Sequence, residues 1–478
     1  MTRARNRPVL LVCLAAAFTT LVDQASLNTA IPALRSELGA GPSTLQWIIA
    51  GYSLTFGLAM VPAGRLGDAH GRKWLFAGGI ALFTAAAVVA GTASQAWVVA
   101  VARLVQGAGA GIVNPQVYGI IQDLFTGRDR ARALGAYATV GGIAAILGPL
   151  VGGAVLGAVG DTGGWRVVLL LTVPFGLITV PLAVRFLPGG RPATSRRTTL
   201  DLPGLALLAA VTLGLLLPFV LPAGQGPATV VWPLIVVAAL VVLWWWERRY
   251  ARSGRTPVLM PELLGSRGFS LGTLTAMFQF GASLSTVLVL VLYLQDVLGW
   301  SPLAAASTTV PGAIGFALAS SQSRRLLARF GRAGVVAALV GSAFSIAATI
   351  VVLHTAPAAV IGIALSCTQF LSGFSGGLMM SPNQALTLAH APAGAAGLAG
   401  AFLQVSQRIS ATLATAAVTG LMATRHGVTP ALTICLVMMT ASAVCAALGL
   451  TGPSGVDKRV DQRGNGLGVA DRGDEVAV

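Results

Sequence analysis

Apolar stretches of about 20 residues recur from one end of this chain to the other, and they limit the folds that it can adopt. A helix of that length rises about 30 Å, which is the thickness of the hydrocarbon core of a bilayer. Only 10% of the 478 residues are charged, whereas about a quarter of the residues of a soluble domain are charged. We therefore predict an all-α membrane protein that crosses the bilayer many times.

The apolar pattern predicts 14 spans, and the positions of the basic residues support this number. With the N-terminus placed in the cytoplasm, all but five of the 31 Lys and Arg fall in the inside segments. Three lie in outside loops (Arg35, Arg166 and Arg425), and two lie within spans (Arg103 and Arg408). This asymmetry follows the positive-inside rule and predicts a multi-pass protein of the cytoplasmic membrane with both termini inside. It also explains the net charge of +16 without a nucleic-acid partner.

An internal repeat indicates how the spans are grouped. The segment "GRLGDAHGRK" follows span 2 and "RRLLARFGRA" follows span 10, and they share a Leu, a Gly and an Arg at the same spacing. Parallel halves of this kind are a known transporter plan. We predict two six-helix bundles with two helices inserted between them and a disordered cytoplasmic tail. The predicted boundaries are 1–187, 188–268, 269–451 and 452–478.

Other classes of protein are not indicated by the sequence. There is no G-x-x-x-x-G-K-[ST] phosphate loop, so ATP is not expected to supply the energy directly. The four cysteines lie in apolar runs without metal-ligand spacing, and no metal site or disulfide is expected. No nucleophile-and-base arrangement suggests catalysis. We expect no enzyme activity and no cofactor.

Five ordered motifs carry a family resemblance. "GRLGDAHGRK" resembles the loop 2–3 signature of the major facilitator superfamily, and "LGPLVGG" resembles its span 5 motif. "RLVQGAGAG" resembles its span 4 motif. "LVDQASLNTAIP" and "LQWIIAGYSL" are similar to spans 1 and 2 of the 14-span drug:proton antiporters, in which Asp23, Asn28, Gln46 and Tyr52 match. The resemblance implies the major facilitator fold with two extra central helices. It also implies efflux of an antibiotic, drug or secondary metabolite, driven by the proton gradient.

Asp23 and Arg103 are the predicted proton-coupling pair. Span 1 runs outward and span 4 inward, so Asp23 lies roughly 15 Å and Arg103 roughly 9 Å below the outer surface. In the fold that the resemblance implies, both spans line the central cavity. As a hypothesis, Arg103 lowers the proton affinity of Asp23 in one state, and separation or burial raises it in the other. The alternatives are a structural ion pair or a cap at the outer end of the helix.

The loop 2–3 motif is the predicted gating element. Gly64 and Gly71 allow close approach and a tight turn. Asp68 is placed to cap the N-terminus of span 3, while Arg72 and Lys73 lie at the cytoplasmic face. One interpretation is a charge latch that holds one state of a rocking transporter. The other is a fixed turn with solvated charges.

The span 5 motif contains Gly148, Pro149, Gly152 and Gly153. Pro149 is expected to bend the helix, and the glycines allow close helix packing. By resemblance the motif is a hinge that favours export. The alternative is generic packing of small residues.

Several polar residues within spans are candidates for a substrate cavity, or equally for hydrogen bonds that join helices: Asn28, Gln46, Tyr52, Gln279 and Gln404. No role is assigned to Arg408, since the family pattern places an arginine one position earlier; a structural arginine and a substrate contact are both open.

One carboxylate, Asp23, is expected deep in a span. The predicted substrate is therefore a hydrophobic small molecule that is neutral, zwitterionic, anionic or at most a monocation, and not a dication. A monomer is expected. The alternatives to an exporter are a proton-coupled transporter of a small nutrient or amino acid, or a membrane sensor without transport.

Overall fold

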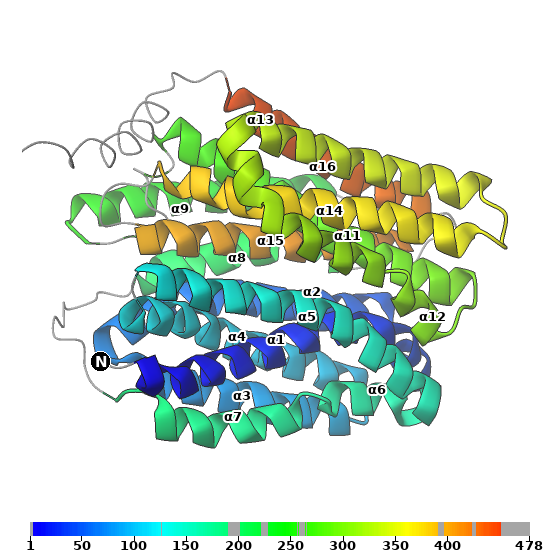
Figure 1. The fold of residues 1–478 in the computed structure, drawn as a ribbon, viewed down its shortest axis with the longest axis horizontal. Helices are drawn as coiled ribbons and strands as arrows, with labels where there is room; N and C mark the ends of the chain where they lie inside the picture. Colours follow the sequence, from blue (N-terminus) through cyan, green and yellow to red (C-terminus); the bar gives the residue numbers. More distant parts are fainter. Residues whose placement is uncertain are drawn as a thin grey trace, which may run out of the picture.

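The computed structural model describes most of the chain. It covers residues 3–125, 127–189, 201–220, 228–255, 257, 263, 265–390, 396–422 and 427–450. Within these ranges every regular element is a helix. Figure 1 shows the helices running side by side in two groups, with α1–α7 in one and α11–α16 in the other. The predicted tail, 452–478, lies outside the described residues.

The first bundle contains the long helices that carry most of the sequence motifs. Its helices are α1 Arg3–Leu38, α2 Pro42–His70, α3 Arg72–Thr92, α4 Ala96–Leu124, α5 Gly127–Val159, α6 Asp161–Leu170 and α7 Val173–Phe186. Residues 162–186, from α6 and α7 together, make one candidate membrane span. Two further helices, α8 Leu202–Val220 and α9 Ala228–Arg252, pack against each other, and α8 also contacts α2 and α15.

The second bundle follows. Its elements are α11 Arg267–Leu292, a π-helical turn η1 Tyr293–Val297, α12 Pro302–Ser307, α13 Val310–Thr355, α14 Ile361–Leu388, α15 Ala396–Met422 and α16 Val428–Leu448. One candidate span, Pro302–Ser323, runs from α12 into α13, and a second, Arg325–Thr355, follows within α13, where Gly331 leaves the helical conformation. Eleven described helical segments are long and apolar enough to cross a bilayer. With α8, α9 and α15 they give the 14 predicted spans, and the predicted fold class is confirmed.

The internal repeat reappears at the turns between spans. Gly71 joins α2 to α3 with a φ of +94°, and Gly331 interrupts α13 with a φ of +52°. Both values lie in the region that glycine adopts at little cost, because it lacks a Cβ. The two glycines that match in sequence therefore make the same kind of turn in the two bundles.

Paired glycines set the closest helix contacts in each bundle. A Cβ added at Gly107 or Gly111 of α4 would overlap the carbonyl oxygens of Tyr52 and Phe56 in α2. In the second bundle, Gly373 and Gly377 of α14 meet the carbonyls of Gly312 and Phe316 in α13 in the same way. Small residues four apart let two membrane helices approach backbone to backbone. The span 4 motif "RLVQGAGAG" therefore fixes the distance between α4 and α2.

Gly111→Ala is expected to destabilise the protein, whereas Gly78→Ala is not. The new methyl group at 111 would meet backbone, which cannot turn away, so overpacking costs about 1–3 kcal/mol. A Cβ at Gly78 of α3 would meet nothing within 4 Å, and alanine is the better helix former by about 1 kcal/mol. Thermal unfolding of the two variants in detergent should therefore shift in opposite directions from wild type. Equal shifts would show that this contact does not limit stability.

The largest apolar cluster joins the two bundles at the outer end. We name the two ends of the molecule after the predicted topology, so that the outer end holds residues 39–41 and 93–95. One apolar cluster joins the outer part of the first bundle, including Leu27 and Ile31, to the second bundle, including Leu288. Toward the inner end, one cluster stays within the first bundle, with residues of α1, α3, α4, α5 and α7 and Leu187, and another contains Leu263, Phe269 and Ala399. A further cluster packs Phe56 and Met60 of α2 against Val405 of α15. The described core is thus continuous between the bundles at the outer end.

Candidate functional site

A buried ion pair lies at the centre of the first bundle. Arg103 Nη1 of α4 donates a 2.6 Å hydrogen bond to Asp23 Oδ2 of α1. Gln106 Nε2 donates to the other carboxylate oxygen, Asp23 Oδ1, at 2.8 Å, and its own Oε1 accepts from Arg103 Nη1 at 2.8 Å. Asp23, Arg103 and Gln106 therefore form a closed triangle of hydrogen bonds. Two of its three members are the residues predicted from the sequence.

The triangle is shielded from solvent. Asp23 is 2% exposed, Arg103 1% and Gln106 0%. The guanidinium of Arg103 also lies over the ring of Tyr52, 4.4 Å from its centroid, which adds a cation–π attraction. Removing charges from water is costly unless they are paired and hydrogen-bonded. This geometry meets that condition on the carboxylate side, while Arg103 Nε has no hydrogen-bond partner among the described residues.

The loop 2–3 motif is built around Arg72. Its Nη2 donates to Asp68 Oδ1 at 2.6 Å, and its Nε donates to Asp123 Oδ2 at 2.8 Å. Asp68 belongs to α2, Arg72 to α3 and Asp123 to α4, so one guanidinium ties three helices of the same bundle. Asp123 was not predicted from the sequence. The role of this cluster as a latch stays a prediction.

The expected capping role of Asp68 is wrong. α2 continues to His70, so Asp68 is still helical, and the residue before α3 is Gly71, without a side-chain cap. A single linking residue leaves no room for an aspartate in the extended conformation that an N-cap requires. Gly64 faces Pro115 of α4, and Lys73 lies beside the ring of Trp74 at 5.6 Å.

The span 5 glycines face two different partners. Cβ atoms added at Gly148 and Gly152 would meet α1, at Ala25 and Thr29, whereas one added at Gly153 would lie 2.7 Å from Leu303 Cα in α12 of the other bundle. α5 is helical through Pro149. Gly153 therefore contributes to the contact between the bundles at the outer end.

Gly153→Leu is expected to open the outer end, because leucine cannot fit against the α12 backbone. An overpacking cost of about 1–3 kcal/mol to this conformation corresponds to a shift of roughly fivefold to a hundredfold toward other states. The matched control is Gly157→Leu, one turn further along α5, where an added Cβ meets nothing within 4 Å. The measurement is labelling of a Leu288→Cys variant, free of native cysteines, by a membrane-impermeant maleimide. Equal labelling in both backgrounds would contradict the assignment.

The candidate cavity residues separate into two groups. Asn28 and Tyr52 line an enclosed cavity of about 20 Å³ at the interface of the bundles, beside Arg103. Such a volume holds about one water. Gln46 is instead buried between α2 and α15, where its Nε2 donates to the Ala416 carbonyl at 3.3 Å. Gln279 donates to Ser283 within α11 at 3.2 Å. Gln404, partly exposed in α15, makes no hydrogen bond to the triangle within the described part of the chain.

Arg408 lies near the middle of α15 and reaches across to the first bundle. Its Nη1 donates to Gln24 Oε1 of α1 at 3.1 Å. Its guanidinium lies 4.1 Å from the ring centroid of Phe56 and 5.3 Å from that of Phe280. Gln24 was missed in the sequence, since the contact joins residues 384 positions apart. The one sequence signal for a role of Gln24 is that it directly follows Asp23.

Two further buried carboxylates lie on the inserted helices. Asp201, directly before α8, and Glu247 of α9 are both 0% exposed. Asp201 Oδ1 accepts from the Gly204 amide and from Trp246 Nε1, each at 2.9 Å. These two carboxylates are buried at helix ends, whereas the sequence prediction concerned a carboxylate deep in a span. Asp23 remains the one that the structure places beside the interface of the two bundles.

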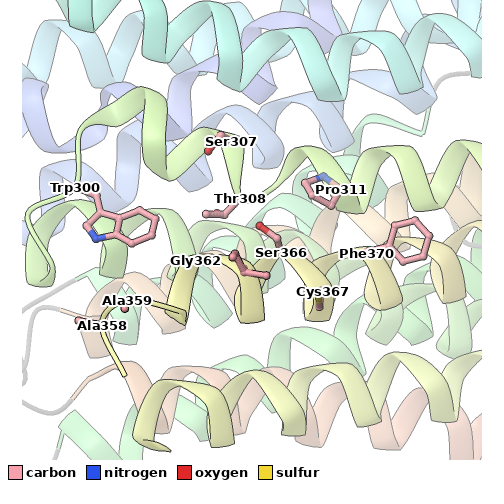
Figure 2. A pocket seen from close by; sticks show the side chains of 11 residues that line it. Trp300, Ser307, Thr308, Pro311, Ala358, Ala359, Gly362, Ser366, Cys367 and Phe370 are labelled. Atoms are coloured by element: carbon pink, nitrogen blue, oxygen red, sulfur yellow. The ribbon is translucent and has the colours of Figure 1, made fainter. Parts of the chain in front are cut away.

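The larger cavity lies elsewhere. It has a volume of about 590 Å³ and is formed by residues around α12, the start of α13 and the start of α14. Figure 2 shows Trp300 at one end and Phe370 at the other, with Ser307, Thr308 and Ser366 between them. Its rim includes Ile363, which is 71% exposed, and its lining residues carry no charge. None of the predicted site residues belongs to it, so size alone does not make it the transport site.

Comparison with known proteins decides the family. The sequence profile of the Major Facilitator Superfamily matches residues 13–415. The chain belongs to this superfamily. The match includes α1 with Asp23, α4 with Arg103 and α15 with Arg408, and the predicted superfamily is confirmed.

Several curated superfamily members resemble this chain over most of its length. The probable actinorhodin transporter of Streptomyces coelicolor is 32% identical over 86% of this chain and 72% of its own. The puromycin resistance protein pur8 of Streptomyces alboniger is 32% identical over 89% and 85%. The cephamycin export protein CmcT of Amycolatopsis lactamdurans is 33% identical over 66% and 64%. These names agree with the antibiotic-exporter resemblance.

Several solved transporter structures share the fold. An auto inhibited POT family peptide transporter superposes with a TM-score of 0.69 at 15% identity, covering 94% of this chain and 98% of its own. A D-xylose-proton symporter gives a TM-score of 0.66 at 14% identity, covering 92% and 96%. At this identity the likeness concerns the fold alone.

Proposed function

We propose that this protein exports an antibiotic or a related hydrophobic small molecule across the cytoplasmic membrane in exchange for protons, with both termini in the cytoplasm. The names of the relatives support the substrate class. The observation that carries the coupling is the buried triangle of Asp23, Arg103 and Gln106. An ionisable pair held inside the membrane by a transporter is a site for proton relay.

The conformation supports an alternating-access cycle. The largest apolar cluster joins the bundles at the outer end, and the inner-end clusters around Phe76 and Phe269 each stay within one bundle, which supports an inward-facing state. In that state Asp23 is an anion held by Arg103 and Gln106, and the substrate enters from the cytoplasm. When the outer end opens, a proton from outside binds the carboxylate, and Arg103 keeps Gln106 as its partner. Return to the inward state releases that proton inside. The proton gradient supplies the energy, and no cofactor or catalytic step is needed.

The test is a resistance and accumulation panel. Cells with and without the protein are compared for growth on antibiotics of several classes and for drug content, each with and without a protonophore. A lower drug content in cells with the protein supports the proposal if the protonophore removes this difference. Higher content of a nutrient or amino acid would indicate the importer alternative, and no change with any compound would indicate a sensor. Strong export of a bis-quaternary dye would contradict the predicted exclusion of dications.

A further inference from the structure

We infer that Arg408 binds an anionic group of the exported molecule, a carboxylate or phenolate on an aromatic or apolar body. This inference rests on the proposed export function and names its substrate class. It begins from the charges at mid-membrane, where the described chain places three: Asp23, Arg103 and Arg408.

The first two charges cancel and the third does not. Asp23 and Arg103 are joined at 2.6 Å. Arg408 has no carboxylate within 4.0 Å of its nitrogens in the described part of the chain. The layer between the bundles therefore carries one positive charge in excess. A charged side chain at this depth is costly and normally lies beside a counter-charge or a water-filled cavity.

The surroundings of Arg408 leave room for such a counter-charge. Arg408 and Gln24 are partly exposed, although both lie far from the ends of their helices, whereas Arg103 is fully buried. The partial exposure of Arg408 and Gln24 leaves the guanidinium accessible to a small molecule, whereas the Asp23 triangle is sealed.

The contacts of Arg408 suit an amphiphilic anion. The rings of Phe56 and Phe280 flank the guanidinium and can pack against an apolar body. One amide oxygen, from Gln24, occupies one of its five N–H donors. A planar guanidinium matches the two oxygens of a carboxylate, and such charge-assisted bonds are about twice as strong as the neutral bond to Gln24. Tyr52, one turn before Phe56 in α2, has no hydrogen-bond partner for its Oη within the described part of the chain.

The position of Gln24 connects this site to the proton site. Asp23 binds Arg103 of its own bundle, and its neighbour Gln24 binds Arg408 of the other bundle. An anion that replaces Gln24 on Arg408 frees α1 from α15 on the side next to Asp23. Substrate binding and the contact between the bundles are thereby linked through two consecutive residues.

Gln24→Glu is the sharpest variant, because it is isosteric and supplies the missing carboxylate from within the protein. The glutamate oxygen replaces an amide oxygen that already lies 3.1 Å from Arg408 Nη1. The variant is expected to neutralise Arg408 and exclude an external anion. If Arg408 were only structural, the same ion pair would form without any effect on ligand charge preference.

The experiment measures binding of pyrenebutyrate, its carboxamide and a trimethylammonium analogue to the full-length protein in nanodiscs. Wild type is expected to prefer the carboxylate to the carboxamide by about tenfold or more. Gln24→Glu and Arg408→Gln should remove that preference, and Arg408→Lys, which keeps the charge, should retain part of it. The control Arg185→Gln removes one positive charge from an exposed position in the last turn of α7 and should change nothing.

Equal carboxylate preference in wild type and in both Gln24→Glu and Arg408→Gln would overturn the inference, as would a wild-type preference for the cation or binding of none of the three probes. These outcomes are separate from failure of the proposed function. Carboxylate binding that depends on Arg408, in a protein that lowers the cellular content of no drug, would retain the anion site and reject export.

Discussion

Asp23→Asn is expected to stop proton-driven export in membrane vesicles and to leave a folded protein in the membrane. Asparagine keeps the shape of the side chain and an oxygen that can accept from Arg103 Nη1, and the Gln106 amide can turn to suit the new Nδ2. What the variant loses is the group that binds and releases a proton. Substrate uptake into inverted vesicles driven by an imposed pH gradient should fall to the level of vesicles without the protein.

The control for this prediction is exchange without a gradient. An antiporter that cannot be protonated still has substrate contacts, so labelled substrate should exchange against unlabelled substrate across the membrane of Asp23→Asn proteoliposomes. Retained gradient-driven uptake in this variant would show that Asp23 only holds α1 against α4.

Arg103→Met is expected to be the most destabilising single substitution in the site. It leaves Asp23 buried with Gln106 as its remaining partner in the triangle, and removing one member of a buried ion pair costs about 3–5 kcal/mol. The double variant Asp23→Asn with Arg103→Met removes both charges and should recover most of that loss. Thermal unfolding in detergent of the two single variants and the double variant measures the coupling energy directly.

Gradient-driven uptake, measured in the same three variants, separates the structural role of the pair from its role in carrying the proton. The double variant should be stable and inactive in gradient-driven uptake. A double variant that regained proton-driven export would assign the pair a purely structural role and place the proton elsewhere. Glu247 and Asp201 would then be the next buried carboxylates to test.

Depth along a helix, together with the fold that the family resemblance implies, predicted the Asp23–Arg103 pair. Each residue rises about 1.5 Å along a helix axis, so counting from the span ends placed both side chains in the outer half of the membrane. The structure places them in contact. Gln106 lies one turn after Arg103 in the same motif, but sequence reasoning gave it no role, because the pattern does not say which side chain closes the triangle.

Contacts between distant spans were not predictable in the same way. The bonds from Arg408 to Gln24 and from Gln46 to the Ala416 carbonyl join residues more than 350 positions apart. They depend on the relative orientation of the two bundles, which the apolar pattern of a single helix does not encode. Of the two interpretations that the sequence left open for Gln46, a cavity residue or a hydrogen bond that joins helices, the structure shows the second.

The error at Asp68 has a local cause. The motif suggested a loop between spans 2 and 3, and an aspartate before a helix is a common cap. The structure replaces that loop with one residue, Gly71, whose φ of +94° reverses the chain at once. Asp68 consequently stays in α2 and binds the Arg72 side chain instead of the backbone amides of α3.

The second bundle shows why coupling is assigned to the first. Gln369 stands four residues before Gly373, as Arg103 stands four residues before Gly107, and the two glycines make the same contact. The repeat thus preserves the packing and replaces the arginine with a neutral amide. The described mid-membrane part of the second bundle contributes Arg408 and no carboxylate.

Counting protons on substrate binding tests the central claim most directly. A purified exporter in weakly buffered detergent solution is mixed with a substrate found in the resistance panel, at a pH where a fraction of Asp23 is protonated, and the released protons are measured with an indicator dye. We predict release of up to about one proton per protein from wild type and none from Asp23→Asn. Equal release from both proteins would contradict the claim that Asp23 carries the exchanged proton.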